Sequence, residues 1–304
     1  MGSRDRSELE RNLRSIRTRI DARLPELCPA EDLSPENLHR SMRYSLLAPG
    51  KRIRPIITVL TAETLGASPD VAIDPACAIE MVHAASLILD DLPSMDDAAE
   101  RRGKPANHIV FGQDIATLAA VSLLNQAYAV LTRAPGLEVG PRLDLVRELT
   151  SIIGDGGLVS GQVHDLELTG QSDPCPDHLE RMARQKTGAL FDVCARMGAI
   201  VAGASGRHVE AVRTFACALG LCFQVLDDLV DGMVSAPTDG TFAGEDHRKA
   251  TFVSSMGPER AKTFSEELVR DAVRALEPIG PAADKMAGFA HYVFQSSWRL
   301  TTQP

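Results

Sequence analysis

Two short aspartate-rich segments, residues 90–97 and 227–231, constrain the fold of this chain more than any other feature of its sequence. Each follows a long stretch in which apolar residues recur with the spacing of a helix, starting near residues 75 and 209. Like charges one turn apart weaken a helix, and apolar neighbours limit the solvation of the carboxylates. We therefore expect a positive group, either a metal ion or basic side chains, to offset the charge of each segment.

The remaining sequence also favours helices. Aromatic residues make up 4% of the chain, and Ala and Leu are abundant, a balance that favours helices over sheets. Helical spacing also covers residues 7–24 and the nearly unbroken apolar run 114–131, which we expect to be central. Pro and Gly clusters predict turns at residues 48–50, 134–136 and 170–176, and a polar loop at residues 232–246. We predict an all-α chain with a single domain over residues 1–304.

Charge, hydropathy and cysteine usage argue against several classes of protein. A net charge of −9 argues against nucleic acid as a partner. We expect no apolar run to be long enough to cross a bilayer, and hence no membrane span. Six cysteines without a CxxC pair, together with a charged N-terminus, predict a reduced, cytoplasmic protein.

The local geometry of the two aspartate segments predicts metal binding. Pro93 disfavours helix at the preceding residue, so the first helix should end near Asp91, and Asp96 should return from a turn towards Asp90. Asp227 and Asp231 are one turn apart on one helix face. Carboxylates without Cys or His in ligand spacing suit Mg²⁺ or Mn²⁺ rather than Zn²⁺. The alternative for one cluster alone is a solvated helix end, but two clusters after apolar helices favour metal sites.

Basic residues near the acidic segments predict phosphate binding. They occur at residues 51–54, 101–104, 184–187 and 248–249. Any one of these groups is usually a solvated patch. Together with divalent metal ions they describe pockets for two diphosphates, one bridged by metal and one held directly by Lys and Arg.

With these motifs the sequence resembles the trans-isoprenyl diphosphate synthases, most closely the bacterial geranylgeranyl diphosphate synthases. The resemblance runs from about residue 38 to residue 257. It is carried by GKRIRP at residues 50–55, EMVHAASLILDDLPSMDDAAERRGKPANH at 80–108, GQVHDLEL at 161–168, KTGALF at 186–191 and FQVLDDLVDG at 223–232.

The resemblance implies an isoprenoid synthase helical bundle around a deep central cavity, assembled as a homodimer. Such enzymes are Mg²⁺-dependent prenyltransferases that condense isopentenyl diphosphate with an allylic diphosphate, here farnesyl, geranyl or dimethylallyl diphosphate, by ionisation, condensation and elimination. The expected product is geranylgeranyl diphosphate. Three Mg²⁺ ions are expected, with Mn²⁺ as a substitute.

The resemblance also assigns roles to individual residues. The metal ligands would be Asp90, Asp91, Asp96, Asp97, Asp227, Asp228 and Asp231. The catalytic set would be Asp90, Asp91, Asp227, Asp228 and Lys186. Isopentenyl diphosphate would be held by Lys51, Arg54, His83 and Arg102. The allylic diphosphate would be held by Arg101, Lys186, Thr187, Gln224 and Lys249.

Product length is expected to depend on the helix before the first aspartate segment. Ser86 lies one turn before Asp90 on nearly the same face, and Ala85 lies beside it. In relatives with short products an aromatic residue here forms a floor, so two small residues leave room for a C20 chain. The alternatives are that these residues only pack against another helix, or that residues 114–131 supply a floor.

The sequence departs from the family pattern in the loop after the second aspartate segment. Thr238 stands where a diphosphate-binding lysine is usual, which puts the turnover rate in doubt more than the reaction class.

Three rival functions remain open at this point. They are a farnesyl diphosphate synthase, a non-catalytic partner subunit that tunes product length, and a class I terpene cyclase. The subunit would typically have lost an aspartate motif, and the cyclase would not need basic residues for a second diphosphate.

Overall fold

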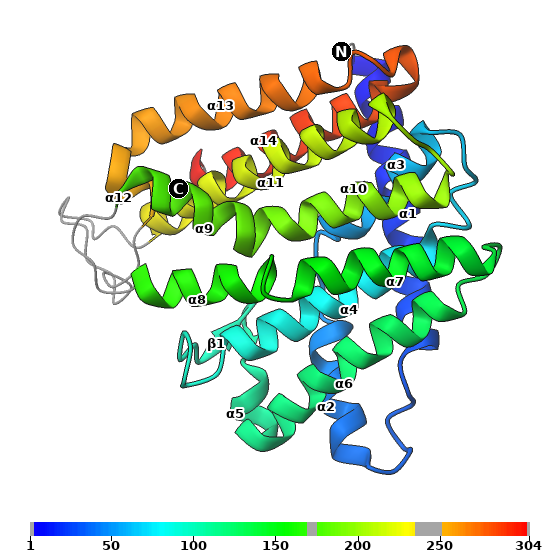
Figure 1. The fold of residues 1–304 in the computed structure, drawn as a ribbon. Coiled ribbons are helices and arrows are strands. Elements are labelled where there is room, and N and C mark those ends of the chain that lie inside the picture. The colour runs from blue at the N-terminus through cyan, green and yellow to red at the C-terminus, as the bar shows by residue number, and fades with distance from the viewer. Residues whose placement is uncertain (1–2, 169–174, 235–250, 303–304) are drawn as a thin grey trace. The chain divides into compact units, whose positions relative to one another are not determined.

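The computed structural model describes residues 3–168, 175–234 and 251–302, and it is helical almost throughout (Figure 1). The helices of the first 132 residues are α1 (Ser3–Leu27), α2 (Glu36–Leu46), α3 (Ile53–Thr64), α4 (Ile73–Asp90), α5 (Asn107–Phe111) and α6 (Gln113–Thr132). The later ones are α7 (Val139–Ile153), α8 (Leu158–Leu168), α9 (Pro176–Ala183), the π-helix η1 (Arg184–Gly188), α10 (Ala189–Val201), α11 (Arg207–Val234), α12 (Phe252–Met256), α13 (Pro258–Ala275), the 3₁₀-helix η2 (Gly280–Ala283) and α14 (Asp284–Thr302). In the described residues, strands are limited to the short hairpin β1 (Glu100–Arg101) and β2 (Lys104–Pro105). The all-α prediction is confirmed.

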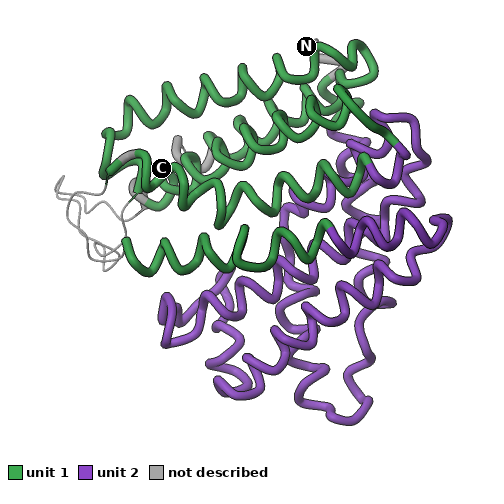
Figure 2. The backbone as a smooth tube through the Cα atoms, viewed as in Figure 1, with its two compact units in different colours: residues 1–9, 148–199, 204–304 green, residues 10–147, 200–203 purple. Residues whose placement is uncertain are grey.

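The chain divides into two compact units (Figure 2). Unit 1 contains residues 1–9, 148–199 and 204–304, and unit 2 contains residues 10–147 and 200–203. The first aspartate segment belongs to unit 2 and the second to unit 1. The prediction of one domain over residues 1–304 stays a prediction.

Unit 2 is organised around α4. This helix packs against α2, α3 and α6, and most of its side chains are buried. A helix that is apolar on nearly all sides is stable only when it is surrounded by other elements. Pro75 stands near its start, where a missing N–H costs no hydrogen bond. The helix ends at Asp90, as the position of Pro93 predicts.

Unit 1 is organised around α11, which packs against α12, α13, α14 and η1. The close approach of α11 to α10 and η1 depends on Gly220. A Cβ atom there would lie 3.0 Å from the Cβ of Phe191 and 3.2 Å from the Cα of Gly188. The helix continues through Gly232 to Val234, so the expectation that a loop begins at residue 232 is wrong. One glycine in a last turn costs only about 1 kcal/mol. Residues 235–246 of the expected loop lie outside the described residues.

Two helices correct the expectation about apolar runs. The stretches Gln113–Thr132 and Arg207–Asp231 are long and apolar enough to cross a membrane, judged by length and composition alone. The apolar window is 56% buried in the second stretch and 39% buried in the first. The prediction that residues 114–131 are central is therefore only partly right, since α6 is buried on one side and exposes apolar residues on the other.

Candidate active site

The chain reverses direction immediately after α4, as predicted. The backbone N–H of Asp96 donates to the carbonyl of Asp90 over 2.9 Å, and that of Asp97 donates to the carbonyl of Leu92 over 3.1 Å. Asp97 closes the turn with a φ of 51°, a left-handed conformation that Asp tolerates better than most residues. The turn therefore brings Asp96 back beside Asp90, within unit 2.

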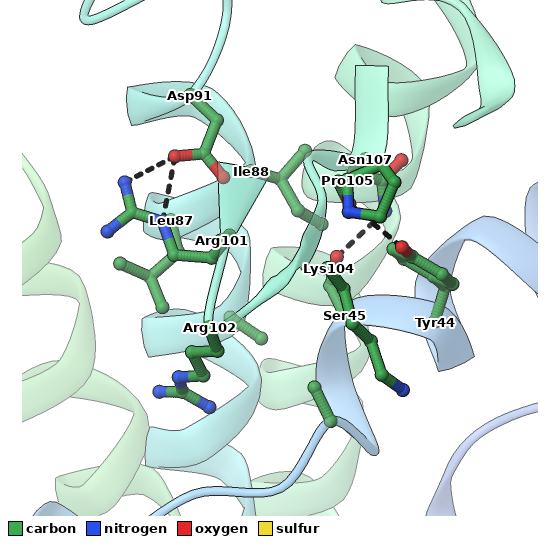
Figure 3. A pocket seen from close by; sticks show the side chains of 12 residues that line it. Tyr44, Ser45, Leu87, Ile88, Asp91, Arg101, Arg102, Lys104, Pro105 and Asn107 are labelled. Carbon is green, nitrogen blue, oxygen red and sulfur yellow. Dashed lines mark hydrogen bonds and ion pairs between the residues drawn. The ribbon is translucent and has the colours of Figure 1, made fainter. Parts of the chain in front are cut away.

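Asp91, at the start of this turn, is only 2% exposed. Its Oδ1 accepts from the Nε of Arg101 over 2.9 Å and also from Nη2 of the same guanidinium (Figure 3). Burial opposes the charge of Arg101, but the hydrogen bond to Asp91 and the charges of Asp91, Asp90 and Asp96 together outweigh it and raise the pKa of the guanidinium. Sequence reasoning assigned Asp91 to metal and Arg101 to the allylic diphosphate; in this structure they bind each other and fix the hairpin to the end of α4.

Arg102 follows Arg101 at the turn of this hairpin (Figure 3). Positive φ values at Arg102 (55°) and Gly103 (72°) form its tight turn. Nη1 of Arg102 donates to the carbonyl of Pro49 over 3.3 Å. A Cβ atom on Gly50 would lie 2.9 Å from that Nη1, so the glycine of the GKRIRP segment leaves room for this arginine.

Arg54 and His83 complete a basic cluster that lies entirely in unit 2. Nη1 of Arg54 lies 3.3 Å from Nε2 of His83. Burial, reinforced by Arg54 and Arg102, lowers the pKa of His83 well below its usual value, so the imidazole is neutral. Burial also lowers the pKa of Arg102, and the neighbouring Arg52 and Arg101 act in the same direction. Lys51 lies exposed on the segment that leads into α3. The structure thus brings Arg54, His83 and Arg102 together, and an anion there would relieve the repulsion between the two arginines.

On the second aspartate segment, the three carboxylates differ in their environment. Asp227 and Asp231 are exposed, one turn apart on α11. Asp228 instead accepts from the backbone N–H of Phe252 over 2.8 Å and from Nε2 of Gln224 over 2.9 Å. Burial raises its pKa to about 7 even though these two hydrogen bonds act in the opposite direction.

Gln224 extends this network to η1. Its Oε1 accepts from the hydroxyl of Thr187 over 2.7 Å, so Thr187, Gln224 and Asp228 form one chain of hydrogen bonds. All three residues were predicted from the sequence, and the structure places them together within unit 1. Lys249, Arg248 and Thr238 lie outside the described residues.

Sequence reasoning assigned no role to two further residues of unit 1, Gly161 and Asp165. Nζ of Lys186 donates to Oδ2 of Asp165 over 2.6 Å. A Cβ atom on Gly161 would lie 2.2 Å from the backbone nitrogen of Lys186, so only glycine lets α8 approach η1 this closely. The spacing of four between Gly161 and Asp165, one helical turn, was the signal that could have linked them. Single-turn π-helices often occur at functional sites.

Comparison with known proteins decides the family. A protein-family model described as "Polyprenyl synthetase" matches residues 35–275. This chain belongs to the polyprenyl synthetase family. The heterodimeric geranylgeranyl pyrophosphate synthase large subunit 1 of Arabidopsis thaliana is 43% identical, over 85% of this chain and 72% of that protein. A geranylgeranyl pyrophosphate synthase of Catharanthus roseus is 41% identical, over 85% of this chain and 74% of that protein.

Solved structures agree with this polyprenyl synthetase assignment. An FPP/GFPP synthase from Zymomonas mobilis superposes with a TM-score of 0.85 at 31% identity, covering 95% of this chain and 99% of that one. A geranyltransferase from Legionella pneumophila gives a TM-score of 0.85 at 26% identity, covering 97% and 99%.

The donor set of this polyprenyl synthetase fits magnesium. Each aspartate segment offers only carboxylate oxygens, which hard divalent cations prefer. Among the residues that the structure describes, no group of three or more His, Cys, Asp or Glu side chains converges as a ready-made metal site. Mg²⁺ is commonly held by one or two carboxylates together with substrate phosphates. One or two carboxylates of a segment are therefore enough to fit Mg²⁺.

Proposed function

We propose that this chain is a Mg²⁺-dependent prenyltransferase that condenses isopentenyl diphosphate with an allylic diphosphate, preferably farnesyl diphosphate, to give geranylgeranyl diphosphate. The observation that carries the proposal is the basic cluster of Arg54, His83 and Arg102 in the same unit as the first aspartate turn. An enzyme acting on one diphosphate would not need it. The names of the curated relatives favour geranylgeranyl diphosphate as the product.

Magnesium would be held by Asp90 and Asp96 with Asp97 in support, and by Asp227 with Asp231. Bound Mg²⁺ supplies charge stabilisation to a departing diphosphate. We propose three Mg²⁺ ions with Mn²⁺ as a substitute. Asp91 and Asp228 would add carboxylate oxygens to these sites, oriented by the hydrogen bonds that they accept from the protein.

The chain's own residues would bind and orient the two substrates. Lys51, Arg54, His83 and Arg102 would hold isopentenyl diphosphate, and Lys186 and Thr187 the allylic diphosphate. Breaking the allylic C–O bond releases diphosphate, and the isopentenyl double bond forms the new C–C bond to the allylic carbon. The proton lost in the last step goes to the released diphosphate. The apolar side chains of α4 would exclude water from the cation.

Release of diphosphate tests the reaction class. The purified chain with isopentenyl diphosphate, farnesyl diphosphate and Mg²⁺ should release one diphosphate per condensation, and EDTA should abolish the release. If the two substrates react only after a second protein is added, the partner-subunit reading is correct instead.

Product length is predicted to change at Ala85. This residue is fully buried, and the neighbouring Ser86 donates its hydroxyl to the carbonyl of His83 over 3.0 Å. Ala85→Phe should shorten the product towards farnesyl diphosphate, because the ring would block the path of the chain; mass spectrometry of the products measures this. The matched control is Leu87→Phe, on another face of α4, which should leave product length unchanged. An unchanged product in Ala85→Phe would place the floor elsewhere.

We propose further that the chain forms a homodimer through α6. Leu118 and Val121 are 55% and 56% exposed on one face of this helix, and Ile109 and Val110 on α5 are also exposed. Exposed apolar patches mark protein interfaces, and a second copy presents the same self-complementary surface. Leu118→Glu with Val121→Glu should reduce the mass measured by light scattering from dimer to monomer. Thr132→Glu, at the exposed end of the same helix, is the control; a dimer in the double variant refutes this surface.

We propose a cytoplasmic location, supported by six free cysteines. The names of several relatives place them in chloroplasts or mitochondria, which does not favour this location. Fractionation of expressing cells tests it.

A further inference from the structure

Arg52 is the most deeply buried basic residue of the GKRIRP segment. It is 5% exposed, whereas Lys51 before it is exposed to solvent. Its backbone is left-handed, with φ of 53° and ψ of 35°, at the residue that caps the start of α3. A non-glycine residue in this conformation is uncommon and persists only where the surroundings hold it.

Three contacts hold the Arg52 guanidinium. Its Nη1 donates to Oε1 of Glu80 over 2.6 Å, its Nε donates to Oδ1 of Asp21 over 2.8 Å, and its Nη2 donates to the carbonyl of Ala48 over 2.9 Å. Glu80 is itself only 3% exposed. Each nitrogen of the guanidinium therefore already has an acceptor within the protein, which argues against direct binding of a phosphate.

The position of Glu80 links Arg52 to the basic cluster. Glu80 and His83 are three residues apart on α4 and so lie on the same side of that helix. Arg52 contacts the first, and Arg54 contacts the second. The two arginines thus fix the register of the GKRIRP segment against α4. A Cβ atom on Gly50 would also lie 3.5 Å from Nη1 of Arg52 and 2.9 Å from Nη1 of Arg102, so the buried pair adjoins the third member of the cluster.

We infer that the buried Arg52–Glu80 pair is a positioning device that sets the affinity of the basic cluster for isopentenyl diphosphate. Arg52 acts through Lys51 and Arg54, which it flanks, and Glu80 holds Arg52. This inference rests on the proposed function, which assigns the cluster to that substrate. Breaking a buried ion pair leaves an uncompensated charge, so loss of one partner should disturb the cluster more than loss of both.

The test compares Glu80→Gln and Arg52→Lys with a cycle made of Arg52→Met, Glu80→Met and the variant that carries both Met substitutions. Each single variant should raise KM for isopentenyl diphosphate by about tenfold or more and leave KM for farnesyl diphosphate and kcat within about threefold. The double variant should be less impaired than the product of the effects of its two single Met variants. Calorimetric titration with inorganic diphosphate should show the same weakening without turnover.

Asp74→Asn provides a matched structural control. Asp74 is 6% exposed in the same unit and accepts from Nε of Arg23 over 2.8 Å and from Nη2 over 3.0 Å. Asp74→Asn should lower Tm to about the same extent as Glu80→Gln, without changing KM for isopentenyl diphosphate or KM for farnesyl diphosphate.

The outcomes separate the possible failures. If the unmodified chain releases no diphosphate, the proposed function is wrong. If the unmodified chain is active but Glu80→Gln only lowers Tm, as Asp74→Asn does, the pair is merely structural and the inference is overturned. If Arg52→Lys raises KM but Glu80→Gln does not, Arg52 contacts the substrate itself and the inference is again overturned.

Discussion

Replacing Asp90 or Asp227 by Ala should lower kcat by roughly 100- to 1,000-fold, because each change removes a carboxylate proposed to hold charge stabilisation at the departing diphosphate. Asp90 stands at the end of α4 beside the turn that returns Asp96, and Asp227 is exposed on α11. Neither position is needed to fill a core, so the variants should fold. Steady-state kinetics of diphosphate release measures the loss, and thermal unfolding checks that Tm is retained.

Asp144→Ala is the matched control for these two variants. Asp144 is also an exposed aspartate on a helix, and its ion pair is to Arg147, one turn away. Such surface pairs contribute about 0–1 kcal/mol, so kcat and Tm should hardly change. If Asp90→Ala and Asp227→Ala retained the activity of this control, the metal-binding account would be wrong.

Replacing Gly161 by Ala should affect stability and activity together. The new Cβ atom would lie 2.2 Å from the backbone nitrogen of Lys186 and 2.5 Å from its Cα, and backbone cannot rotate out of the way as a side chain can. Helix α8 and the π-helix η1 must therefore separate. Overpacking of this kind costs about 1–3 kcal/mol in the free energy of unfolding. The shift should also break the bond between Lys186 and Asp165, and so lower kcat at temperatures where the variant is folded.

The control for this change is Gly140→Ala on α7. No atom lies within 4 Å of a Cβ built on Gly140, so Ala should be neutral or should stabilise the helix by about 0.5–1 kcal/mol. Denaturant unfolding and steady-state kinetics measure both variants. If Gly161→Ala left both the free energy of unfolding and kcat unchanged, the close approach of α8 to η1 would not be required for stability or activity.

Sequence reasoning was most successful where chemistry follows from local geometry. The proline after the first aspartates predicted both the end of α4 at Asp90 and the return of Asp96. The family motifs assign Arg54, His83 and Arg102 to the same diphosphate, and the structure places these three residues in one cluster.

The misses are long-range pairings that composition and periodicity do not encode. The buried ion pair between Arg52 and Glu80 joins residues 28 positions apart. The need for glycine at residue 161 arises only from the backbone of η1. In α6, apolar residues lie on both the buried and the exposed side, so periodicity alone could not distinguish a core helix from one with an apolar outer face.

We propose above that this chain alone builds a C20 diphosphate from two smaller ones. The most direct measurement is mass spectrometry of the products formed by the purified protein from farnesyl diphosphate, isopentenyl diphosphate and Mg²⁺. The account predicts mainly geranylgeranyl diphosphate, with none in EDTA. Unchanged substrates, or a product formed only when a second protein is added, would contradict it.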